Sequence, residues 1–296
     1  MDPQVILYGL GVGVLIGLTG IGGGSLMTPL LILFAGIHPT VAIGTDLAYG
    51  AVTKTLGGWR HLRKGTVDLG VSKWLAFGSV PGSVAGVLLL DLVLKSKPDL
   101  LLLGVGATLL VVAISVLFRA LFLLAAIERE RHTVALTTGT KVTAVTIGAV
   151  LGLLLGLTSV GSGALIGLAL ILVFRLTPHR VVGTDVFHAA IVLWAAGLAQ
   201  LVAGNVDFGL MATILVGSLP GVVIGTALVD KVPANGLRPA LGCVLLGSAL
   251  GVFSKAGADV PTWTIVGVPA IVGVVAYLIN RRRPTVRPPA TEAAPA

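Results

Sequence analysis

The chain has 296 residues, of which 55% are hydrophobic and only 11% are charged. Because soluble domains carry about 25% charged residues, this composition excludes an ordinary soluble protein and indicates an integral membrane protein. The net charge of +8 lies in short loops and near the C-terminus, which is typical of membrane orientation signals and not of a nucleic-acid surface.

Apolar segments follow one another along the whole chain. They span residues 5–36, 40–58, 71–94, 99–125, 142–174, 179–203, 209–229, 237–254 and 262–279. Most have the length of one membrane crossing, which takes about 20 residues. The segments 5–36 and 142–174 are longer and are interrupted by glycine clusters. The sequence therefore predicts an all-α integral membrane protein with about 8–10 membrane helices.

The two halves of the chain repeat one sequence pattern. Residues 17–91 align without a gap to residues 156–230, and 28 of the 75 aligned pairs are identical. A duplicated apolar unit with glycine-interrupted segments at matching places is typical of secondary transporters that bind substrate between their halves. We therefore expect the chain to divide into four parts: a first transmembrane repeat over 1–126, a cytoplasmic linker over 127–141, a second transmembrane repeat over 142–280 and a disordered cytoplasmic tail over 281–296.

Loop charges predict that the two repeats have inverted topology. Loop 59–73 carries four Lys and Arg residues, whereas the corresponding loop 203–209 carries none. Loop 36–40 carries no Lys or Arg, whereas its counterpart 174–180 carries two Arg residues. Because Lys and Arg mark the cytoplasmic side, equivalent loops should face opposite sides of the membrane. Inversion requires that each long broken segment form a helical hairpin followed by three spanning helices, and not one long tilted helix. We expect a multi-pass protein of the cell inner membrane with a cytoplasmic C-terminus.

The glycine clusters are the first candidate for a substrate site. Non-helical backbone at membrane depth is tolerated only where it is buried in protein or lines a watery cavity. The helix that follows each cluster presents its positive end to whatever lies in the turn, which suits an anion. Close packing between helices is the competing explanation. The substrate-binding residues predicted here are Gly22, Gly23, Gly24 and Ser25 of the first repeat and Gly161, Ser162 and Gly163 of the second.

Each repeat also carries an Asp after a Gly-Thr pair, Asp46 after Thr45 and Asp185 after Thr184. An ionisable side chain inside a membrane segment costs about 2.5–3.5 kcal/mol and usually faces a pathway. We therefore expect the two Asp residues to couple ion movement and the two Thr residues to bind substrate. The alternative is that each Thr-Asp pair caps the start of a helix.

Other chemistry has little support in the sequence. Lys54 is a weaker substrate candidate, because a Lys near the end of its segment can extend to the membrane surface. No Ser/His/Asp set, HExxH motif or pair of cysteines occurs, and Cys243 is the single cysteine. We expect a protein that is not an enzyme and needs no cofactor or metal.

The chain resembles the TauE/SafE family of sulfite exporters. The resemblance lies in the glycine-rich segment 20–24, in Pro29 and in the A-x-G-T-D motif over 42–46, with a degenerate second copy in which Ser159 and Ser162 replace glycines. It implies transport of small sulfur-containing anions such as sulfite or sulfonates. The expected partners are this small anion and the lipid bilayer, with no nucleic acid. The oligomeric state stays open, with a homodimer as one option.

Three modes of action fit these patterns. A carrier binds its substrate between the repeats, a passive anion channel shares the inverted hairpins, and a membrane scaffold would only hold a partner. Buried acids, one in each repeat, favour a proton-coupled carrier over a pore. A scaffold leaves those acids and the broken helices without a purpose.

Overall fold

The regular elements in the described part of the chain are helices. The computed structural model describes residues 2–19, 23–122, 134–228 and 234–281. The helices are α1 (Pro3–Thr19), α2 (Gly24–Leu33), α3 (Pro39–Arg63), α4 (Leu69–Leu89), the π-helix η1 (Leu90–Leu94), α5 (Pro98–Phe122), α6 (Thr138–Thr158), α7 (Leu165–Leu172), α8 (Pro178–Val202), α9 (Phe208–Leu228), α10 (Ala234–Lys255) and α11 (Thr262–Arg281). Among the described residues, seven helices are long and apolar enough to cross a membrane. The predicted all-α membrane fold is confirmed.

The helices break at the predicted glycine clusters. In the first repeat α1 ends at Thr19 and α2 begins at Gly24; Gly22 lies outside the described residues. In the second repeat the turn between α6 and α7 contains three residues with left-handed backbone, Ser159 (φ 59°), Gly161 (φ 109°) and Gly163 (φ 105°). A right-handed helix cannot continue through such residues. The break is off-centre, because α6 has 21 residues and α7 only 8.

The alternative that Thr45-Asp46 and Thr184-Asp185 cap helix starts is wrong. Helices α3 and α8 begin earlier, each with a proline at its first position. Proline suits that position because the first N–H groups of a helix have no partner within the helix. Both Asp residues therefore lie about two turns inside a continuous helix. The N-caps in these regions are Asp68, which accepts from the Val71 amide before α4, and Asp207, which accepts from the Leu210 amide before α9.

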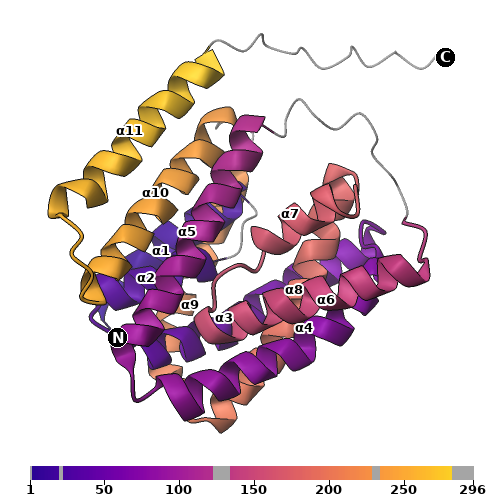
Figure 1. Ribbon diagram of the computed structural model, residues 1–296, viewed down its shortest axis with the longest axis horizontal. Coiled ribbons are helices and arrows are strands. Elements are labelled where there is room, and N and C mark those ends of the chain that lie inside the picture. The colour runs from indigo at the N-terminus through magenta and orange to yellow at the C-terminus, as the bar shows by residue number, and fades with distance from the viewer. Residues whose placement is uncertain (1, 20–22, 123–133, 229–233, 282–296) are drawn as a thin grey trace.

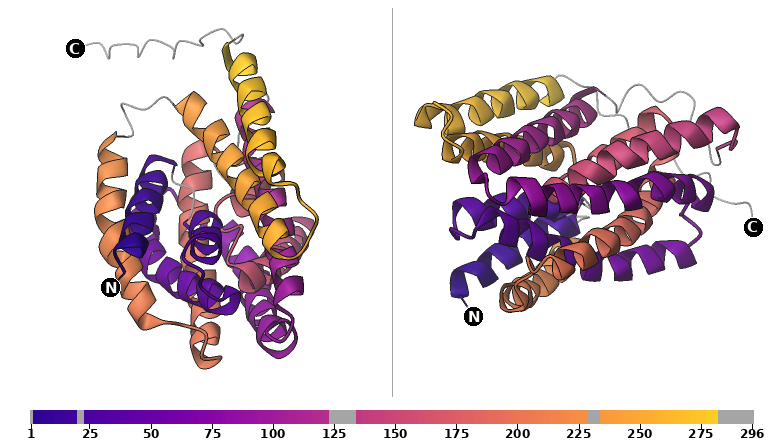
Figure 2. Two further views of the ribbon diagram at one scale, coloured as in Figure 1. Left: turned by 90° about the vertical axis from the view of Figure 1, so that its left-hand side faces the viewer. Right: turned by 60° about the horizontal axis from the view of Figure 1, so that its bottom comes forward.

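Helices of one repeat pack mainly on helices of the other. Helix α1 lies along α9 and its equivalent α6 lies along α4, while α3 packs on α8 and α5 on α10 (Figure 1). The equivalent helices α3 and α8 run antiparallel, since Gly50 faces Leu193 and Gly57 faces Val186. Helix α11 follows α10 on the outside of the bundle (Figure 2). The sidedness of the two repeats in the membrane, and the division at 126 and 141, stay predictions.

Glycines allow the backbones of α1 and α9 to touch, which yields a test of the packing. A Cβ atom on Gly13 would lie 2.9 Å from the Cα of Ser218, whereas Gly11 on the same helix has no described atom within 4 Å of that position. Overpacking costs roughly 1–3 kcal/mol. We expect Gly13→Leu to lower the melting temperature in detergent by about 5–10 °C and Gly11→Leu to leave it nearly unchanged. Equal melting of the two variants would contradict the close contact of α1 and α9.

Candidate functional site

A small cavity lies where the two helix breaks meet α3. It is lined by Gly23 and Gly24 from the first break, by Ser159 and Ser162 from the second, by Leu193 of α8 and by five residues of α3: Asp46, Tyr49, Gly50, Thr53 and Lys54. The two breaks touch directly, because a Cβ atom on Gly24 would collide with the carbonyl oxygen of Ser159. Segments 139 residues apart in the chain thus form one site between the repeats.

Asp46 is held by hydroxyl groups from both repeats. Its Oδ2 atom accepts hydrogen bonds from Thr28 Oγ1 at 2.6 Å and from Ser159 Oγ at 2.8 Å. The side chain is only 1% exposed, and its Oδ1 atom has no hydrogen-bond partner among the described residues. A buried carboxylate oxygen without a donor is costly, so this atom is suited to receive a proton or a ligand.

Lys54 lines the same cavity two helical turns after Asp46. Its Nζ atom is buried and has no hydrogen-bond partner in the described part of the chain. Burying an ammonium group without a hydrogen-bond partner costs several kcal/mol, because the charge loses its hydration. An anion in the cavity would supply the missing hydrogen-bond partner of this ammonium group.

Asp185 occupies the equivalent position on α8 and is also buried. Lys54 and Arg119 of α5 lie within electrostatic range of its carboxylate, although neither forms a direct ion pair with it in the described residues, and the backbone amide of Gly163 lies beside it. Its Oδ1 atom has no partner within the described residues. Arg119 was not predicted from the sequence, because α5 lies outside the aligned part of the repeats.

The predicted Thr residues lie elsewhere. Thr45 Oγ1 accepts from the Asp207 amide at 3.0 Å, and Thr184 Oγ1 accepts from the Asp68 amide at 2.8 Å. Each Thr therefore holds the loop of the opposite repeat and does not line the cavity. Of the other predicted binding residues, Ser25 is buried and does not line the cavity, and Gly161 and Gly163 shape the turn around Ser162.

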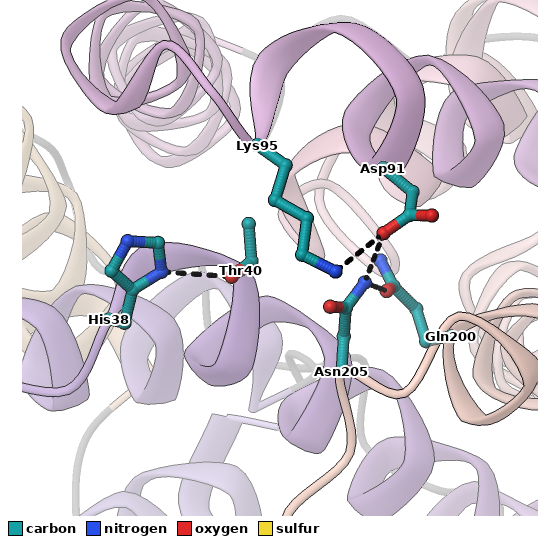
Figure 3. A network of polar contacts seen from close by, with 6 residues as sticks. All are labelled: His38, Thr40, Asp91, Lys95, Gln200 and Asn205. Carbon is teal, nitrogen blue, oxygen red and sulfur yellow. Dashed lines mark hydrogen bonds and ion pairs between the residues drawn. The ribbon is translucent and has the colours of Figure 1, made fainter.

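A polar network fixes the loop after α8 (Figure 3). Asp91 of η1 accepts from Lys95 at 2.9 Å and from Asn205 at 3.3 Å, and Asn205 also donates to Gln200 at 2.8 Å. The loop that contains Asn205 continues to Asp207, whose amide bonds Thr45 one residue before Asp46. The network thereby helps to hold α3 in place against the second repeat.

Comparisons with known proteins fit this arrangement. The model of the sulfite exporter TauE/SafE family matches residues 5–253. The chain belongs to the TauE/SafE family. Three similar proteins from Bacillus subtilis (strain 168) are described as probable membrane transporter proteins. YjnA is 38% identical, and the match covers 84% of this chain and 99% of YjnA. YdhB is 28% identical, with 80% of this chain and 94% of YdhB covered. YunE is 25% identical, with 84% of this chain and 98% of YunE covered. No solved structure matches the chain.

The match runs from residue 5 of the first repeat to residue 253 of the second and includes every element that builds the cavity. The protein is therefore a multi-pass membrane transporter of this family, as the sequence predicted. The matched region ends before α11 begins at Thr262.

Proposed function

We propose that this protein is a proton-coupled secondary transporter of small sulfur-containing anions such as sulfite or sulfonates. The substrate occupies the cavity formed by Gly23, Gly24, Ser159 and Ser162, with Lys54 as its cation. The two repeats are inverted in the cell inner membrane, and the C-terminus is cytoplasmic. The family supports the class of substrate, and the antiparallel contact of α3 with α8 supports the inversion.

The observation that carries this proposal is the buried ammonium group of Lys54. Lys54 lines the cavity together with Gly23 and Gly24 of the first break and Ser159 and Ser162 of the second. Backbone N–H groups at helix breaks and one ammonium group are donors that match the oxygens of a small oxyanion. The buried Asp46 in the same cavity gives the transporter a group that can exchange a proton when the anion enters.

A carrier and a passive anion channel are separated by the kinetics of flux. Purified protein in liposomes should take up radiolabelled sulfite in a saturable way, faster when an inward proton gradient is imposed. Sulfonates should compete, whereas chloride and small cations should not. A flux that rises linearly with sulfite concentration and ignores the proton gradient would indicate a channel. Absence of any anion flux would reject the proposed function.

A further inference from the structure

Three buried polar atoms without a hydrogen-bond partner belong to residues that line the cavity. They are Oδ1 of Asp46, the phenol oxygen of Tyr49 and Nζ of Lys54. The other residues of the described chain with such an atom do not line the cavity, namely Ser25, Ser72, Asp185, His188, Gln200 and Ser218. A buried polar group without a partner is costly. Three of them around one cavity therefore point to a ligand that bonds all three.

The three side chains come from one face of α3. Their spacing of three and five residues keeps them on one side of an α-helix, and Gly50 and Thr53 between them also line the cavity. The Tyr49 side chain is only 1% exposed. Its ring packs on the first break, because a Cβ atom on Gly23 would lie 3.5 Å from Cε1 of the ring. Packing thus holds the phenol group at the cavity wall.

The phenol of Tyr49 is free where its counterpart in the second repeat is engaged. Tyr49 aligns with His188, and Ser218 aligns with Ser79. The ring atom Nε2 of His188 is paired with Ser79 Oγ at 3.1 Å. In the first repeat Ser218 lies beside Tyr49, yet neither hydroxyl makes a hydrogen bond of good geometry in the described residues. The first repeat therefore keeps a donor available for a ligand.

The three groups can each donate one hydrogen bond to an anion. The Lys54 ammonium donates and supplies the charge, and the Tyr49 phenol donates a neutral O–H. Asp46 donates once it carries the proton that the proposed function assigns to it. An –SO₃ group offers three oxygens on one atom, one for each donor. A carboxylate offers two oxygens and leaves one buried donor without a partner, which a polar site penalises strongly.

Resting on the proposed function, we propose that Tyr49 determines the specificity of this site for –SO₃ groups. Its phenol O–H donates to the third oxygen of the bound group, while Lys54 and the protonated Asp46 bond the other two. The charge of Lys54 attracts sulfonates and carboxylates alike, so the discrimination between them comes from the third oxygen. The cavity thereby accepts sulfite and sulfonates and disfavours carboxylates of the same charge and size.

The test uses methanesulfonate and acetate, which share a methyl group and a single negative charge but differ in their number of oxygens. Their affinities are measured by calorimetric titration of the purified protein in detergent at one pH. We expect the wild type to bind methanesulfonate at least about tenfold more tightly than acetate, the usual worth of one hydrogen bond to a charged group. Tyr49→Phe should weaken methanesulfonate about tenfold. The same variant should weaken acetate less than about twofold, because its two oxygens keep two donors.

Tyr8→Phe is the matched control, since it removes a phenol hydroxyl from α1, where the ring lies 6.4 Å from that of Phe34 and does not line the cavity. It should bind both anions like the wild type. Equal weakening of both anions by Tyr49→Phe, or no weakening of either, would overturn the role of Tyr49.

The wild type alone decides the question if Tyr49→Phe does not fold. A wild-type protein that transports sulfite but does not bind methanesulfonate more tightly than acetate would overturn the selection by the third oxygen. A wild-type protein without sulfite flux would instead reject the proposed function, so the two failures are distinguishable.

Discussion

Lys54→Gln should lower saturable sulfite uptake at least about 30-fold, because truncating one partner of a buried charge pair costs roughly 2–5 kcal/mol. The glutamine keeps much of the stem and one donor but removes the charge that the anion needs. Among the described residues, Lys54 is the one cation that lines the cavity. The loss should come from weaker anion binding, which is measured by titrating sulfite against the purified protein and by uptake into liposomes.

Two further variants separate charge from folding. Lys54→Arg retains the positive charge and should recover part of the uptake. Lys64→Gln removes an exposed lysine just after the end of α3 and should transport like the wild type. If Lys54→Gln transports sulfite normally while remaining monodisperse, the ammonium group does not bind the substrate.

Gly24→Val should reduce transport to the background of empty liposomes. A Cβ atom on Gly24 would collide with the Ser159 carbonyl and lie 3.2 Å from Asp46 Oδ2, so a branched side chain must push the two breaks apart. Glycine is required here by the close approach of two backbones. The matched control is Gly104→Val on α5, where no described atom lies within 4 Å of the added Cβ.

The result is informative only for protein that inserts and folds. Both glycine variants are therefore compared by size-exclusion chromatography in detergent before sulfite uptake is measured. We expect Gly24→Val to remain folded but inactive, and Gly104→Val to match the wild type in both measurements. Normal uptake by Gly24→Val would show that the contact of the two breaks is not part of the transport site.

The sequence was most informative about the course of the chain. Hydrophobic segments with the length of a membrane span predicted the helices, and the glycine clusters marked both breaks, because backbone conformations open to glycine interrupt a helix locally. The internal repeat also showed that Asp46 and Asp185 are equivalent. These are local or periodic signals, which a single sequence carries in full.

Side-chain partners were less accessible from the sequence. Thr45 and Thr184 were assigned to the substrate, yet they bond amides of the opposite repeat, contacts that depend on how α3 and α8 pack. Arg119 lies beyond the aligned repeats, and its guanidinium group occupies the space beside Gly167, a contact that depends on the position of α5.

The most direct test of the account is to locate a bound oxyanion. Selenite has the charge and pyramidal shape of sulfite, and its selenium atom gives an anomalous X-ray signal. Crystals grown with selenite, at a concentration that inhibits sulfite uptake, should show one anomalous peak beside Lys54 Nζ, between the backbones of Gly24 and Ser162. A peak outside this cavity, or no peak in the cavity at that concentration, would contradict the site that we propose.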